Sequence, residues 1–246
     1  MHAGEWWKSD LRQVLADALR TGSEFNASDA NTINGQPGDL FPCSRDGTFK
    51  LPVEDGETYM LRLINAVFTY ESFFSVAGHS LTVVGTDGSY VKPFSVDYIF
   101  IAPGQTVTAL LTADRASRGL RNARYYMAAR PLLPNNPFVI FNNGTATAVL
   151  EYAADAAAPS GGAAPDPEFP VLPAINDSAA ADAYTSRLRS LASEEHPVNV
   201  PRHVQEHMLV TLAVNMIVCS PNEHCQGPDG DVACLRCFLF KSCPRG

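Results

Sequence analysis

The stretch TYMLRLI at residues 58–64 decides the fold class, because its side chains alternate between two kinds. A β-strand directs successive side chains to opposite faces of a sheet. We therefore expect Tyr59, Leu61 and Leu63 on one face, against a hydrophobic core, and Arg62 on the other. The stretch predicts a half-buried strand.

Six further runs share its features: each is short, rich in β-branched and aromatic residues, and bounded by Gly, Pro, Asn or Asp. They lie at residues 73–76, 81–86, 98–102, 106–111, 125–129 and 145–152. So many short antiparallel strands favour an all-β fold, a Greek-key β-sandwich or barrel. Helical periodicity precedes them at residues 6–21, where Leu11, Val14 and Leu15 share a stripe and Gly22 is placed to end the helix.

The segment after the strands changes composition. Residues 153–170 are crowded with Ala, Pro and Gly, which predicts a linker. A short helix is expected at residues 178–192, capped by Asp177 or Ser178. Residues 208–218 resemble a strand that has no obvious partner strands.

We therefore divide the chain into three parts. They are a β-domain at 1–152, a linker with one short helix at 153–199, and the start of a further domain with a Cys-containing tail at 200–246.

Composition excludes several functions. The 246 residues carry a net charge of -8 without long charged runs, which argues against a nucleic-acid partner. No window approaches the ~20 apolar residues of a membrane span, and the start MHAGEWWKSD lacks the apolar core of a signal peptide. No motif of a serine hydrolase, a phosphate-binding loop or a dinucleotide site is present.

Three Asn-X-Ser/Thr sequons, at Asn26, Asn143 and Asn176, are candidate glycosylation sites.

Cysteine and histidine offer few ligand sets. Cys219 and Cys225 bracket a small loop and are a candidate disulfide in an oxidising compartment. A zinc site is an alternative for the tail, and an unstructured tail with reactive thiols is favoured over it. The residues that a zinc site would use are His224, Cys234, Cys237 and Cys243. His203 and His207 are four apart but lack a third ligand, and His79 is expected to be a structural histidine at a turn.

Seven short motifs follow one another in a fixed order. They are GEWW (4–7), TING (32–35) before Cys43, LRLINA (61–66), FFSVAGH (73–79), YVKPF (90–94), IAPGQ (101–105) and YMAARP (126–131). Together they resemble the central domain of plant-type laccases, which are multicopper oxidases built from three cupredoxin domains. The likeness continues through the linker towards the third domain, to about Asp231. It implies a cupredoxin-like domain whose first-domain neighbour and most of whose third domain lie outside this sequence.

The resemblance also implies which of the three domains supply the copper ligands. In laccases, copper oxidises diphenols and lignin phenolics and reduces O2 to water, and the copper ligands include His-X-His pairs of the first and third domains. None of the six histidines here is separated from another by one residue. We therefore expect no catalytic and no metal-binding residues in this chain, no cofactor of its own, and no activity by itself. A non-enzymatic cupredoxin-like binding module is the alternative.

Further expectations follow from the family. Glu71 is the candidate contact for a phenolic hydroxyl, with a solvated loop glutamate as the alternative. Cys43 is expected to be a free thiol, because laccases pair the equivalent cysteine with one in the first domain. We expect Gly85 and Gly88 to loosen the hairpin at residues 81–94. The resemblance implies an extracellular, apoplastic location, and phenols, the missing cupredoxin domains or another laccase chain as partners.

Overall fold

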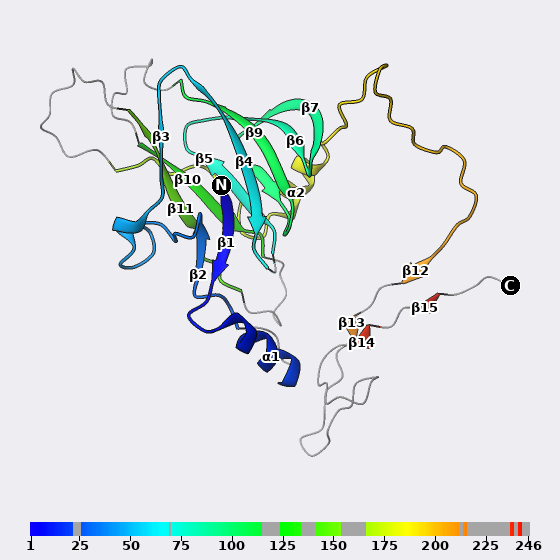
Figure 1. The fold of residues 1–246 in the computed structure, drawn as a ribbon, viewed down its shortest axis with the longest axis horizontal. Helices are drawn as coiled ribbons and strands as arrows, with labels where there is room; N and C mark the ends of the chain where they lie inside the picture. Colours follow the sequence, from blue (N-terminus) through cyan, green and yellow to red (C-terminus); the bar gives the residue numbers. More distant parts are fainter. Residues whose placement is uncertain are drawn as a thin grey trace, which may run out of the picture.

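The computed structural model describes residues 1–21, 26–68, 70–114, 124–133, 141–153, 166–211, 214–215, 237–238 and 241–242. Two β-sheets lie face to face, with helix α1 at one end and helix α2 beside the β6–β7 edge (Figure 1). In order, the first sheet contains β2 (Ala30–Ile33), β1 (His2–Trp6), β4 (Thr58–Ala66), β9 (Thr106–Thr112), β6 (Leu81–Thr86) and β7 (Ser89–Val96). The second contains β3 (Lys50–Val53), β11 (Ala146–Tyr152), β10 (Arg124–Pro131), β5 (Ser72–Val76) and β8 (Ile99–Ile101). The predicted β-sandwich is confirmed.

The alternation predicted for residues 58–64 is present in β4. Leu61 and Leu63 are buried and Tyr59 is partly buried on the same face, whereas Arg62 is exposed. Side chains from both sheets meet in one core, and its largest fully buried members include Ile33, Leu81, Leu111, Met127 and Leu150. The core holds the sandwich together by removing these apolar surfaces from water.

All seven predicted strands exist, but sequence reasoning missed β1, β2, β3 and β7. Two of these, β3 and β7, each contain a proline, at Pro52 and Pro93. A proline in a stretch argues against a strand, because it has no N–H to donate to the ladder, yet it is tolerated in an edge strand. Both strands are edge strands. Two pairings are also parallel, β1 with β4 and β3 with β11, where only antiparallel ones were expected.

The predicted helix at 6–21 begins too early. Residues up to Trp6 belong to β1, which pairs with β2 and β4. Helix α1 spans Leu11–Thr21, and Asp10 caps it by accepting a hydrogen bond from the Arg12 amide at 2.8 Å. Gly22, predicted to end this helix, lies outside the described residues.

The hairpin between β6 and β7 closes in a two-residue turn. Asp87 and Gly88 have φ angles of 47° and 77° and form the two-residue turn that joins the strands. Asp-Gly is a preferred sequence for such a turn, because both central residues must adopt positive φ. Gly85 lies at a bulge between β6 and its neighbours. That these glycines loosen the hairpin stays a prediction.

The second half of the predicted linker packs on the sandwich. Glu168 forms a bridge with Tyr125, and Ser190 forms one with Val91, so this segment touches both sheets. Between these bridges, α2 (Ser178–Thr185) begins at the predicted cap, because Asp177 accepts a hydrogen bond from Ala180. Tyr184 of α2 is only 3% exposed and belongs to the core. The helix ends before the predicted residue 192 because the following residues pair with β7.

The C-terminal part contains two short ladders. β12 (Val210–Thr211) pairs with β15 (Lys241–Ser242), and β13 (Val214–Asn215) pairs with β14 (Cys237–Phe238). The prediction that residues 208–218 have no partner strands was therefore wrong: the Cys-containing tail supplies them.

Candidate functional site

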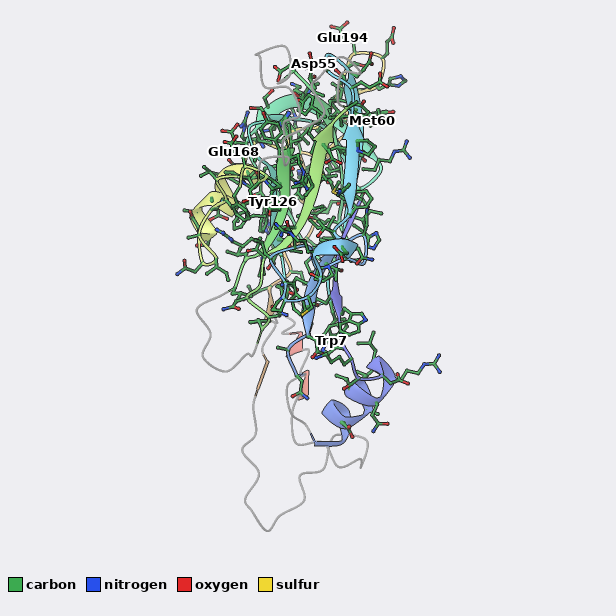
Figure 2. The ribbon with its side chains drawn as sticks, turned by 90° about the vertical axis from the view of Figure 1, so that its left-hand side faces the viewer. Trp7, Asp55, Met60, Tyr126, Glu168 and Glu194 are labelled. Carbon is green, nitrogen blue, oxygen red and sulfur yellow. The ribbon has the colours of Figure 1, made fainter. Side chains whose placement is uncertain are left out.

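A groove opens between helix α1 and the loop that follows β4. Its volume is about 500 Å³, and we call it the α1 groove. The apolar lining consists of Trp7, Leu11, Val14, Leu15, Ala66, Val67 and Phe68. Polar atoms come from Glu5, Asn65 and Gly104. Figure 2 shows Trp7 where the chain passes from the sandwich into α1. Size and lining are typical of a small-molecule site, which is mostly apolar with a few polar groups.

The loop at residues 67–71, described except for Thr69, follows β4 and forms one wall of the groove; a buried amide at the end of β4 holds it. Asn65 is fully buried. Its side-chain amide donates to the Ile101 carbonyl at 2.9 Å and to the Tyr70 carbonyl at 3.3 Å. Its side-chain oxygen accepts from the Val67 amide at 3.0 Å. One side chain therefore ties both ends of this loop to the sandwich.

A second anchor lies at Tyr70, which is 2% exposed. The Tyr70 hydroxyl donates to the Asn31 side-chain oxygen, and the Asn31 amide donates to the Gly144 carbonyl at 2.7 Å. Burial, followed by the nearby Glu5 carboxylate, raises the pKa of Tyr70 far above its ordinary value. The hydroxyl therefore stays protonated and keeps its role as a donor.

Glu5 reaches the same loop from β1. Its Oε2 atom accepts a hydrogen bond from the Phe68 amide at 2.8 Å. The Phe68 side chain is 62% exposed and lines the α1 groove with Trp7. An aromatic pair and a carboxylate thus share one apolar groove, an arrangement that suits a flat ring with a hydroxyl group.

The candidate residue Glu71 is the last residue of this loop but does not line the α1 groove. It is partly buried between Tyr70 and β5, and its carbonyl accepts a hydrogen bond from Leu132 at 2.8 Å. Its contact with a phenol remains a prediction.

Sequence reasoning missed Glu5, Trp7 and Phe68 as members of a site. Glu5 and Trp7 belong to the family motif GEWW at 4–7, and the helical periodicity of residues 6–21 places Trp7 in a helix. A signal was present: the alternation of β4, continued past its end, places Phe68 on the exposed side. A large exposed aromatic residue after a strand is a candidate contact for a ligand.

The histidines of the described residues do not form a metal site. Both ring nitrogens of His79 are engaged, with the Ala77 carbonyl and the Tyr152 hydroxyl, each at 2.7 Å. His79 therefore has the structural role that was predicted. His203 and His207 are exposed and lie outside any helix.

No group of three or more His, Cys, Asp or Glu side chains that could hold a metal occurs within the described residues. The copper that the family uses requires histidine and cysteine ligands. These residues therefore do not fit a copper centre, and we derive no chemical step through copper.

The cysteines can be placed only in part. Cys43 is exposed and is a free cysteine among the described residues. The candidate disulfide of Cys219 and Cys225 lies outside the described residues. The same holds for the candidate zinc ligands, apart from the backbone of Cys237 in β14.

The three sequon asparagines, Asn26, Asn143 and Asn176, are all exposed. Two of the sequons are neighbours in space, because the Asn142 side chain donates to the Ser28 carbonyl at 2.8 Å. Exposure is the first requirement for glycan transfer. In the part of the chain that the structure describes, no helix is long and apolar enough to span a membrane.

Comparison with known proteins gives the family. The family model for multicopper oxidases matches residues 1–155. Laccase-21 of rice (Oryza sativa subsp. japonica) is 52% identical over 233 residues, covering 93% of this chain and 39% of that protein. Putative laccase-9 of the same rice is 53% identical over 248 residues, covering 97% of this chain and 42% of that protein. Fifteen residues follow Asp231, about 6% of the chain, so this match continues beyond the point where the motif resemblance ended.

Among solved structures, the laccase of Botrytis aclada has a TM-score of 0.53 and 21% identity, covering 71% of this chain and 31% of that one. At this identity the likeness concerns the fold alone, which is cupredoxin-like as predicted. The chain spans about two fifths of the length of the curated relatives it matches. Its family match covers the whole β-sandwich, including both walls of the α1 groove. The chain therefore belongs to the multicopper oxidase family, with plant laccases among its relatives.

Proposed function

We propose that this chain is the scaffold domain of a laccase-type enzyme and contributes part of the surface that contacts phenols. The family oxidises diphenols, including lignin phenolics, with O2 as acceptor. We infer that the copper ligands come from other cupredoxin domains, since the described residues of this chain do not fit copper. The chain alone is then inactive as an oxidase.

The observation that carries the proposal is the α1 groove. Its volume of about 500 Å³ lies within the range of small-molecule sites. Trp7 and Phe68 offer aromatic faces to a phenol ring, and the apolar side chains of α1 cover its edge. The Glu5 carboxylate can accept a hydrogen bond from the phenolic hydroxyl, because a carboxylate has several acceptor positions.

Glu71 has a separate place in the proposal. By family resemblance, its carboxylate accepts the phenolic proton as the electron leaves the ring. Glu71 ends the loop at 67–71 and is partly buried. The loop would bring a phenol bound in the α1 groove near to this second carboxylate.

We propose an extracellular, apoplastic location, by family resemblance and because the three sequon asparagines are exposed. Chemical partners are then phenolic small molecules. Protein partners are the other cupredoxin domains or another laccase chain.

Phenol binding tests the proposal. The chain has two tryptophans, so a Trp6→Phe background leaves Trp7 of the α1 groove as the only indole. A dimethoxyphenol should quench its fluorescence with a Kd on the order of millimolar, given a small ligand and ~0.3 kcal/mol per non-hydrogen atom. Leu15→Lys, which puts a charge into the groove, should weaken binding by about tenfold or more.

Met60→Lys is the matched control. Met60 is an exposed apolar residue of β4 on the outer face of the first sheet, remote from the groove lining. Figure 2 shows it on the opposite side of the sandwich from Glu168. This variant should bind like the parent. Equal binding by the Leu15→Lys variant, or none by the parent, would overturn the proposal.

A non-enzymatic binding module is the second candidate, and one observation bears on it. Met60, Ile64 and Tyr90 are exposed around a shallow hollow of about 390 Å³ on the outer face of the first sheet. A domain that works within a larger enzyme is expected to leave such apolar surface where a neighbour packs. Association at micromolar concentration in light scattering supports the enzyme-domain proposal, and a stable monomer supports the module.

A further inference from the structure

Glu5 lies where two strands of the first sheet end side by side. β1 pairs in parallel with β4, and the last pair in this register is Gly4 with Ala66. Glu5 therefore continues alongside the first residues of the loop at 67–71. Its carboxylate meets the Phe68 amide at 2.8 Å.

The tip of this loop needs such a contact. Asn65 fixes the backbone at Val67 and at Tyr70, on either side of the tip. Phe68 lies between these points, and its ring is 62% exposed. Packing therefore fixes the position of Phe68 less than it would fix a buried ring. The hydrogen bond from the Phe68 amide to the charged Glu5 carboxylate contributes correspondingly more.

Phe68 lines the α1 groove together with residues of helix α1. Leu11 and Leu15 line the other wall, and both are also exposed. The distance between these walls decides which ring substituents the groove accepts. A shift of the Phe68 backbone changes that distance directly.

We propose that Glu5 is a positioning residue that sets the width of the α1 groove by holding Phe68, and so selects phenols by the size of their ring substituents. This inference rests on the proposed function of the groove as a phenol site. Glu5 can still accept a hydrogen bond from a bound phenol, but it sets the preference between phenols through Phe68, and it is not the base that receives the phenolic proton.

Two substitutions separate these roles. Glu5→Gln keeps a side-chain oxygen that can accept from the Phe68 amide, but it removes the charge and the basic group. Glu5→Ala removes the acceptor altogether. If Glu5 positions Phe68, the Glu5→Gln variant should keep the slow Phe68 amide exchange and the phenol preference that Glu5→Ala loses. If the charge of Glu5 is what matters, both variants should lose them.

The experiment measures amide hydrogen exchange at Phe68 and the Kd values of phenol and of a dimethoxyphenol in the full chain. Glu5→Ala should speed Phe68 exchange by about tenfold or more and lower the preference between the two phenols by about threefold. Glu5→Gln should keep both quantities within about threefold of the parent chain. Glu57→Ala, an exposed glutamate next to the other end of β4, is the matched control and should change neither.

If Glu5→Ala showed the same Phe68 amide exchange and the same preference between the two phenols as the parent chain, the inference would be overturned. The proposed function as a phenol site would still stand. Weak binding by Glu5→Gln with slow Phe68 exchange would also overturn the inference, in favour of the charge. Absence of phenol binding by the parent chain would overturn the proposed function and the selection of phenols with it. Exchange at Phe68 would then still show separately whether Glu5 holds the loop.

Discussion

Replacing Asn65 by alanine should destabilise the protein far more than its size suggests. The side chain is fully buried and makes three hydrogen bonds: two donated to the carbonyls of Ile101 and Tyr70, and one accepted from the Val67 amide. Alanine leaves these three backbone groups without their partner in the interior. The change tests whether this one amide holds the loop that forms the groove wall.

The expected loss of stability follows from the three hydrogen bonds that the Asn65 side chain makes. Each intramolecular hydrogen bond contributes roughly 0.5–1.5 kcal/mol net, and a buried group left unpaired costs about 1–3 kcal/mol. Water can reach part of a surface loop, so we expect a loss of about 3 kcal/mol in the free energy of unfolding. For a domain of this size the loss corresponds to a fall in Tm of roughly 6–12 °C. Urea denaturation followed by circular dichroism measures it, together with the m-value.

Thr112→Ala is the control. The Thr112 hydroxyl makes an exposed hydrogen bond with Thr58 in the same sheet, at 3.0 Å. Its loss should cost no more than about 0.5 kcal/mol. A loss below about 1 kcal/mol for Asn65→Ala, or one equal to that of Thr112→Ala, would refute the reasoning.

Three further predictions concern other parts of the chain. The Tyr184 hydroxyl is buried and has no hydrogen-bond partner among the described residues, so Tyr184→Phe should be neutral or stabilising, whereas Tyr184→Ala should cost about 3–5 kcal/mol in urea unfolding. Burial, and then Asp39, raises the pKa of Tyr126 from 10.0 to about 12, so the unfolded chain loses this proton at lower pH than the folded one. Stability should fall as pH rises from about 10 to about 12, and Tyr126→Phe should make that fall shallower in pH-dependent unfolding; an unchanged slope would contradict this. Expressed through a secretory pathway, the chain should lose one glycan mass for each sequon asparagine changed to glutamine, and mass spectrometry that finds no glycan would refute extracellular processing.

The sequence predicted those strands whose alternating apolar and polar side chains are visible within a short stretch. β4 and β6 follow their predicted limits within a few residues, because one face of each is buried and alternation is visible. β1 was missed because its existence depends on pairing with β4, some 60 residues away, while the residues after it show helical periodicity. A local window contains no information about such a partner.

The candidate site was harder to predict than the fold. Asn65 and Phe68 lie within or beside a family motif, yet nothing in a motif says that one is buried and the other exposed at a groove. Glu5 becomes a candidate only when β1 and β4 are known to be parallel neighbours. Glu71 was chosen from family resemblance, and the structure places it beside the α1 groove lining without including it.

Copper loading of the purified chain, followed by absorption spectroscopy and a phenol-oxidation assay, tests whether this chain binds phenols without holding a copper centre. We expect no blue thiolate-to-copper band and no turnover above that of a Leu15→Lys variant, together with phenol binding by the copper-free parent chain. A stoichiometric blue centre or copper-dependent turnover by this chain alone would contradict this expectation.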